Sequence, residues 1–397
     1  MAKIALILGS GFSFDAGLPL AKDINKYFIR DNSKNILKFS SGEFMWTDFA
    51  SETYKHNGRL GFDHLSYGIL LNESVAMFIE DKSVFINYEE FYQYIIDNLK
   101  SELFIDKLKK RALIEFNKKF PKIKEYNNHI FYTSAITKFQ RSEFISLINH
   151  LIGDLLYVRI DRNKLANSYA TIINYLQEFD SIDIVTLNHD LLMEELIRDY
   201  LKKEYSNGFS TNQDILKSSE GKSLNTFMGD FSNKINIFKV HGSIDVYSYV
   251  VAEEKGSIVT PTDEVIFFQT HDYDEKQKPI RHDPETGEIV QRFHWAIDPQ
   301  FITGINKIEL LKKPGLYQNL YNESEMRLKD CETLLIIGYS FGDEHINELI
   351  ERTINESKSL EKIININPSP KFPFETGEIE YLHIESIQEL KSLTGNA

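Results

Sequence analysis

Five short runs of aliphatic residues constrain the fold of this chain more than any other feature of its sequence. Each run is bounded by glycine or polar residues, and segments with helical spacing lie between several of them. Such runs are typical of strands buried on both faces of a parallel sheet. The five runs are KIALILG (3–9), SIDIVTLN (181–188), NKINIFKVHG (233–242), ETLLIIGYS (332–340) and EKIININP (361–368).

The alternation of these runs with helical segments predicts an α/β fold, a Rossmann-like doubly wound parallel sheet. We expect a single domain over residues 1–397 that carries two insertions. Apolar residues at three- and four-residue spacing predict a large helical insertion at 31–178, and polar, mixed sequence predicts a loop-rich insertion at 245–330. The segment 377–397 is long enough to add one strand and one short helix.

Net charge and cysteine content exclude several classes of protein. The formal net charge is −14, whereas binding to a phosphate backbone requires a basic face, so we expect no direct nucleic-acid contact by this chain. Cys331 is the only cysteine, which excludes an internal disulfide and a four-cysteine zinc site and fits a reducing compartment. The first apolar run is too short for a secretory signal, and no run approaches the ~18 residues of a membrane span. We therefore expect a cytoplasmic protein without a membrane contact.

A glycine-rich turn, GSGFSFDAG, follows the first predicted strand and opens a helix. In doubly wound sheets, ligands bind beyond the carboxyl ends of the strands. The turn could therefore hold a pyrophosphate on free backbone N–H groups, or it could be a tight turn without a ligand. The full GxGxxG spacing is absent because residue 14 is Phe, and no Walker A sequence occurs in the chain, so the chain is not itself a P-loop ATPase.

Polar residues also follow the other predicted strands. TLNHD contains Asn188 and Asp190, which could contact a ligand or cap the next helix. VHGS contains His241, and the glycine after it allows another group to approach the ring, although a lone histidine is more often structural. GYSFGD and ININP follow the fourth and fifth strands, and Asp343 could likewise be only a helix cap.

In this order, the blocks GSGFSFDAGLP, TLNHD, VHGS, GYSFGD and ININP resemble the signature blocks of the sirtuin-like superfamily. The resemblance extends over the chain from its first predicted strand to its fifth and implies an NAD site. The residues it assigns are Gly9, Gly11 and Ser13 for the phosphates, Asn188 and Asp190 for the nicotinamide ribose and carboxamide, and His241 as the general base. Ser340 and either Asn365 or Asn367 are assigned to the adenosine half, and Gly338 is a further cofactor-binding residue.

Two departures separate the chain from protein-deacetylating sirtuins. Those enzymes normally carry a zinc ribbon with four cysteine ligands, and they follow AGIP with Asp-Phe-Arg, where this chain has Leu20, Ala21 and Lys22. We therefore expect no bound metal and no robust removal of acetyl groups from lysine. Together with NYEEF at 87–91, these features resemble the bacterial sirtuin-like NAD hydrolases of antiphage defence.

This resemblance implies that the chain cleaves NAD to nicotinamide and ADP-ribose in antiphage, abortive-infection defence. NAD carries nicotinamide as a leaving group on an anomeric carbon, so cleavage passes through an oxocarbenium-like transition state. Asn188 could hydrogen-bond the ribose or the attacking water, and His241 could accept a proton, which suits a histidine at neutral pH. The alternatives are a module that senses NAD or ADP-ribose without turnover, a deacylase or ADP-ribosyltransferase, and, least favoured, a dinucleotide-binding oxidoreductase.

Unregulated NAD hydrolysis would kill the cell that makes the enzyme, so the activity needs a gate. The segment after the fifth predicted strand is too short for a sensor domain. We therefore expect gating by assembly, through a homo-oligomer built partly by the 31–178 insertion that docks a separate partner. The resemblance points to a HerA-type ATPase as that partner, with an Argonaute-associated protein as the second candidate.

Overall fold

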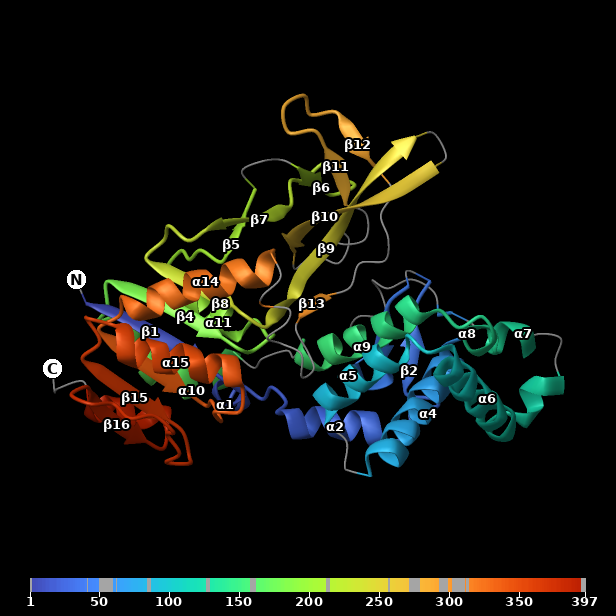
Figure 1. Cartoon of the computed structure of the whole chain (residues 1–397), viewed down its shortest axis with the longest axis horizontal. Helices are drawn as coiled ribbons and strands as arrows, with labels where there is room; N and C mark the ends of the chain where they lie inside the picture. Colours follow the sequence, from blue (N-terminus) through green and yellow to red (C-terminus); the bar gives the residue numbers. More distant parts are fainter. Residues whose placement is uncertain are drawn as a thin grey trace.

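A six-stranded parallel sheet forms the centre of one part of the molecule (Figure 1). The computed structural model describes residues 2–40, 42–49, 60–61, 63–83, 87–125, 129–157, 162–211, 215–255, 258–270, 279–292, 299–301, 311 and 314–393. The order of the strands is β16-β15-β14-β1-β4-β8, and every neighbouring pair is parallel. Numbered along the chain, this is the order 3-2-1-4-5-6 of the Rossmann fold.

The strands of this sheet confirm the expected α/β class and the five predicted strands. A sixth strand and a short 3₁₀ helix, η4 (Ile387–Ser392), come from the C-terminal segment that was expected to add one strand and one helix. The six strands are β1 (Lys3–Leu8), β4 (Ser181–Thr186), β8 (Ile235–Lys239), β14 (Thr333–Ile337), β15 (Lys362–Ile366) and β16 (Glu380–Ile384).

Helices cover both faces of the sheet because successive side chains of each buried strand point to opposite faces. On β1, Ile4, Leu6 and Leu8 pack into a core with α10 (Arg162–Leu176) and α11 (Leu192–Leu196). Ala5 and Ile7 pack into a second core with α14 (Leu316–Lys329) and α15 (Glu344–Glu356). The sheet is therefore doubly wound, as the continuous apolar runs predict.

A separate helical unit, defined here as residues 21–156, has a core of its own and lies beside the sheet in Figure 1. Two short strands inside it, β2 (Ile36–Lys38) and β3 (Phe44–Trp46), were not predicted. Helix α10 falls within the predicted insertion at 31–178 but packs on the parallel sheet instead. The main helices of the unit are α2 (Ala21–Ile29), α4 (His64–Lys82), α5 (Tyr88–Asn98), α6 (Glu102–Lys119), α7 (His129–Tyr132), α8 (Ser134–Thr137) and α9 (Arg141–Leu156).

The region expected to be loop-rich, 245–330, contains regular antiparallel structure. Strand β9 (Gly242–Lys255) pairs with β10 (Ile258–Gln269) in a long hairpin, and both belong to a five-stranded sheet in the order β13-β9-β10-β7-β5. A three-stranded sheet, β12-β11-β6, lies next to it, and its strands β11 (Ile280–His282) and β12 also fall in the region expected to be loop-rich. The remaining strands are β5 (Gly208–Ser210), β6 (Leu216–Lys217), β7 (Asn225–Asp230), β12 (Ile289–Gln291) and β13 (Pro299–Phe301).

The helical unit meets the parallel sheet at the carboxyl ends of β4 and β8. Ile244 and Phe301 are buried members of the helical core, and Leu191 packs against it. Leu191 and Ile244 follow the strand-end blocks TLNHD and VHGS, and Phe301 pairs with Gly242 of the second block. The helical unit therefore packs against the ends of these two strands. None of the described helices is both long and apolar enough to cross a membrane.

Trp46 anchors the core of the helical unit. Its side chain is fully buried, its Nε1–H donates to the carbonyl of Leu151 at 2.9 Å, and its backbone N–H donates to the carboxylate of Asp154 at 2.8 Å. Burial, with the nearby Asp48 and Glu43, raises the pKa of Asp154 to about 7, although the bond from Trp46 opposes this shift. The carboxyl of Asp154 therefore keeps its proton in the folded state at a pH where an unfolded chain loses it.

The pKa of Asp154 predicts a pH-dependent stability. Between pH ~4 and ~7 the unfolded state binds fewer protons than the folded state, so the free energy of unfolding falls as pH rises through this window and levels off above it. Urea unfolding of the wild type and Asp154→Asn at pH 5 to 8 measures the effect. We expect the wild type to lose about 1–2 kcal/mol relative to Asp154→Asn as pH rises; parallel stability curves would contradict the assignment.

Candidate functional site

Three glycines bring the turn after β1 against the end of β14. The Gly9 N–H donates to the Ile337 carbonyl and the Gly11 N–H to the Gly338 carbonyl, each at 3.0 Å. A Cβ at Gly9 would lie 2.5 Å from the Gly338 oxygen, and one at Gly338 would lie 2.4 Å from the Phe12 nitrogen. The N–H groups of Gly9 and Gly11 therefore hold the two strand ends together, and the assignment of Gly9, Gly11 and Ser13 to the phosphates stays a prediction.

A hydrogen-bonded set of polar side chains connects this turn to the end of β4. The Asn188 Nδ2 donates to the Gly9 carbonyl and to Ser13 Oγ, both at 3.0 Å, and Ser13 Oγ donates to Asp190 Oδ2 at 2.8 Å. Asp190 Oδ1 also accepts the N–H of Leu192 at 3.0 Å, so the capping alternative holds for one of its oxygens. The structure thus brings together three of the residues that the sequence assigned to one site.

The buried ammonium of Lys239 contacts the backbone of this set of side chains. Lys239, the last residue of β8, donates to the carbonyl of Asp190 and to Glu194 Oε1, the latter at 2.9 Å. Burial alone would lower the pKa of Lys239, but the carboxylates of Glu194, Asp245 and Asp190 raise it. The ammonium therefore stays charged and fixes the backbone at Asp190. Sequence reasoning missed Lys239 and Glu194, since nothing local indicates that 45 residues of separation close into an ion pair.

Three histidines gather next to this network. His241 is 3% exposed, and its Nε2 lies 2.9 Å from Nε2 of His345, a residue of α15 that the sequence analysis did not single out. The His189 ring lies 6.4 Å from the His241 ring and 5.1 Å from Phe301. The end of β8, which carries His241, therefore lies beside the end of β4.

The predicted adenosine residues occupy different positions. Asn367 lies just past β15, and its Nδ2 donates to the Tyr339 carbonyl at 2.8 Å, which connects the ends of β14 and β15. Ser340 is exposed after β14. Asn365 is fully buried inside β15, and its Nδ2 donates to the Lys371 carbonyl and the Tyr381 hydroxyl, both at 3.3 Å. Of the two asparagines offered for the adenosine half, Asn367 lies past the end of β15 and Asn365 lies within it, and a contact of either one with the adenosine half stays a prediction.

One group of side chains has the chemistry of a metal site. Donor atoms of His241, Asp343 and His345 all lie within 4.8 Å of one another, and two imidazoles with a carboxylate are ligands that several transition metals accept. The 2.9 Å between the two imidazole nitrogens is a hydrogen-bond distance. Two nitrogens on a tetrahedral zinc, each ~2.0–2.1 Å from the metal, would lie farther apart. We therefore interpret the group as a hydrogen-bonded pair, and the absence of a metal stays a prediction.

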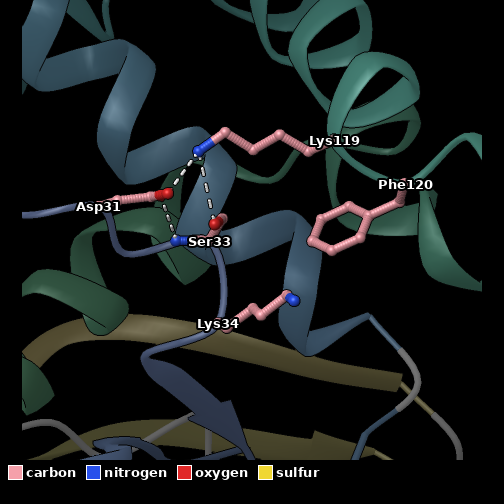
Figure 2. Close-up of a pocket in the computed structure, with 5 residues that line it drawn as sticks. All are labelled: Asp31, Ser33, Lys34, Lys119 and Phe120. Atoms are coloured by element: carbon pink, nitrogen blue, oxygen red, sulfur yellow. Dashed lines mark hydrogen bonds and ion pairs between the residues drawn. The ribbon is translucent and has the colours of Figure 1, made fainter.

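A pocket of about 410 Å³ lies elsewhere, in the helical unit (Figure 2). It is lined by Asp31, Ser33, Lys34, Lys119 and Phe120, and none of the strand-end residues contributes to it. The Lys119 ammonium donates to Asp31 at 2.7 Å and to Ser33 at 3.5 Å, as Figure 2 shows. Its charge is thus already partnered, and the strand ends remain the better candidate site.

The fold and these strand ends define a Rossmann-type protein with a polar site at the carboxyl ends of β1 and β4, next to the point between β1 and β14 where the strand order reverses. The model of the SIR2-like domain family matches residues 183–387, just over half of the chain. The chain therefore belongs to the SIR2-like domain family. No curated protein sequence matches it.

Solved sirtuin structures are similar at a low level. A structure of Sir2Tm bound to a propionylated peptide is 10% identical with a TM-score of 0.36, and the match covers 99% of this chain and 91% of that one. A crystal structure of a Sir2 homologue in complex with NAD is 11% identical with a TM-score of 0.35, covering 98% and 86%. At these identities and TM-scores, neither structure supports a correspondence between individual residues.

The contact between the β1 turn and Gly338 predicts a large cost for a methyl group there. Gly338 has φ +61° and no room for a Cβ, whereas Gly287 has φ +71° with nothing within 4 Å of a built Cβ. Gly287→Ala therefore measures only the cost of holding an alanine at a positive φ, about 1 kcal/mol. We expect Gly338→Ala to lower the free energy of unfolding by clearly more, about 2–4 kcal/mol, in urea unfolding. Equal losses in the two variants would show that the contact is not tight.

Proposed function

We propose that this chain binds NAD at the carboxyl ends of β1, β4, β8 and β14 and cleaves it to nicotinamide and ADP-ribose. Membership in the SIR2-like family supports an NAD-related activity in general, and one of the similar solved structures is a complex with NAD. The observation that carries the proposal is the hydrogen-bonded set Ser13, Asn188 and Asp190, with His241 on the neighbouring strand end. A role in antiphage defence rests on the sequence resemblance alone.

In this proposal Asn188 holds the reacting ribose or the attacking water. Its Nδ2 is committed to Gly9 and Ser13, which fixes the amide plane and leaves the amide oxygen as the acceptor for a hydroxyl or water proton. Because the amide plane is fixed before any ligand arrives, little ordering remains to be done on binding.

His241 supplies the base in this proposal. Water attacks the anomeric carbon, the bond to nicotinamide breaks with its electron pair on the ring nitrogen, and His241 takes the proton from the attacking oxygen. Asp190, whose carboxylate is already held by Ser13 and Leu192, would contact the carboxamide. Because His241 is buried among the strand ends, bulk water has little access to the ring, which limits side reactions.

Product analysis tests the proposal. We expect NAD incubated with the protein to give nicotinamide and ADP-ribose, and Asn188→Ala and His241→Ala to lower turnover by ~10²–10⁴-fold while keeping the wild-type melting temperature. His282→Gln, at a half-buried position on β11 away from the parallel sheet, is the matched control and should keep full activity. Chromatographic separation of the products measures all four proteins.

Other outcomes of the same assay identify the alternative functions. Tight NAD binding without products under all activating conditions would favour the sensing module. Consumption of NAD only with an acetylated peptide, or stoichiometric zinc in elemental analysis, would favour a deacylase. Loss of folding in His241→Ala, with normal activity in the folded fraction, would make His241 a structural residue.

We also propose that the chain acts as a homo-oligomer and docks a HerA-type ATPase. Large apolar side chains on the surface of the helical unit support an interface there, since exposed apolar groups in one region often mark contacts between proteins. Leu103 and Ile114 on α6 are 81% and 61% exposed, and Ile130 and Phe131 on α7 are 69% and 58% exposed.

Light scattering after size-exclusion chromatography tests this assembly. We expect an oligomer in the wild type and a smaller species in Leu103→Glu with Phe131→Glu, because a charge at an apolar interface must be desolvated. Ile258→Glu, at a 68% exposed site on β10, serves as the control and should leave the mass unchanged. A monomeric wild type, fully active alone and unaffected by a HerA-type ATPase, would contradict the proposal.

A further inference from the structure

The imidazole pair of His241 and His345 is a feature that the proposed reaction has not yet used. The two residues are 104 positions apart in sequence, both are buried, and their Nε2 atoms lie 2.9 Å apart. The Tyr321 hydroxyl on α14 donates to the His345 carbonyl at 3.0 Å, which fixes the backbone of His345. Two helices and a strand end thus hold the pair in place.

We propose that His345 and Asp343 are positioning residues that hold the His241 ring in one tautomer and stabilise its protonated form. This inference rests on the proposed function, in which His241 accepts a proton from the attacking oxygen. Its geometric basis is the 2.9 Å contact between the two Nε2 atoms and the carboxylate of Asp343, which has an oxygen within 4.8 Å of a ring nitrogen of each histidine.

Only one direction of the hydrogen bond leaves His241 able to act as a base. In a pair of neutral imidazoles, one nitrogen donates and the other accepts. When His241 donates from Nε2, its Nδ1 carries a lone pair that can take a proton. When His345 donates instead, the Nε2 lone pair of His241 is occupied and its Nδ1 already bears the proton. A base at this position therefore requires His345 to be the acceptor.

Asp343 favours the state that the reaction forms. Asp343 is the N-cap residue of α15, yet its side chain makes no capping hydrogen bond to that helix, and its carboxylate lies near the two rings. Once His241 takes a proton at Nδ1, the ring is positively charged and still donates Nε2–H to His345. A nearby negative charge stabilises that imidazolium, and it does so strongly where water is scarce.

The arrangement follows the general logic of an oriented base. In catalytic triads the second nitrogen of the histidine is held by a third group, which fixes the tautomer and offsets the charge that develops. In this protein the neutral imidazole of His345, with the carboxylate of Asp343 nearby, takes the role of that third group. The loss expected on removing His345 is therefore in turnover, because the bond strengthens only when His241 becomes charged.

Nuclear magnetic resonance of protein labelled with ¹⁵N-histidine tests the resting state without any reaction. We expect correlations through the ring nitrogens to show a proton on Nε2 of His241 and a lone pair on its Nδ1. His345→Leu should release this fixed tautomer, and His282→Gln should leave it unchanged. A proton on Nδ1 of His241 in the wild type, or a metal that a chelator removes from the pair, would overturn the proposal.

Steady-state kinetics test the effect on the reaction. We expect His345→Leu to lower kcat for NAD cleavage by roughly 10²-fold with KM changed less than threefold, since a positioned base contributes ~10²–10⁴-fold. His345→Gln, whose amide oxygen can still accept the Nε2–H, should recover at least tenfold of that loss, and Asp343→Asn should lower kcat as well. Equal kcat in the wild type and His345→Leu, or equal losses in the Leu and Gln variants, would overturn the proposal.

The two measurements separate failure of this inference from failure of the proposed function. If the wild type consumes no NAD under any condition, the proposed function fails, and the tautomer of His241 still decides whether His345 and Asp343 position it. If the wild type is active and the tautomer is wrong, only the positioning proposal fails. Melting temperatures of all variants show whether a loss of kcat reflects unfolding.

Discussion

The close approach of two backbone segments, the turn after β1 and the residues after β14, is the constraint on which the rest of the site depends. Gly9, Gly11 and Gly338 leave no space for a Cβ between them, and two N–H groups of the turn donate across the contact. This contact sets where the helix after β1 begins and therefore where Ser13 lies. Asn188 and Asp190 are in turn held by Ser13, so the polar site follows from the glycines.

The candidate site also depends on a buried ion pair next to it. Lys239 and Glu194 are both almost fully buried and form an ion pair. Removing one partner of such a pair typically costs about 3–5 kcal/mol, because the remaining charge has no water to solvate it. The Lys239 ammonium also donates to the backbone of Asp190. The buried pair therefore contributes to the position of the strand-end loop, and a fixed polar environment is what a reaction with charge development requires.

The sequence predicted those parts of the molecule that depend on local patterns. Buried parallel strands such as β1 and β14 are continuous aliphatic runs, and the helices of residues 21–156 show regular apolar spacing. The hairpin of β9 and β10 was missed because much of it, as in β10, is exposed and carries polar residues. Asn365 and Asn367 were both candidates for one role because the block that contains them extends from inside β15 to beyond its end. The His241–His345 pair was invisible, since only the tertiary fold brings together residues 104 positions apart.

Two residues next to the candidate site, Ile244 and Phe301, belong to the core of the helical unit, which would give a movement of that unit a physical route to the strand ends. Ile244 follows His241 by three residues and is buried in the helical core, and so is Phe301, whose ring lies 5.1 Å from His189. Packed side chains do not deform smoothly, so a shift of the helical unit is transmitted to its contacts as a discrete rearrangement. An oligomer or partner that repositions the helices would therefore act on the strand ends of β4 and β8 through Ile244 and Phe301.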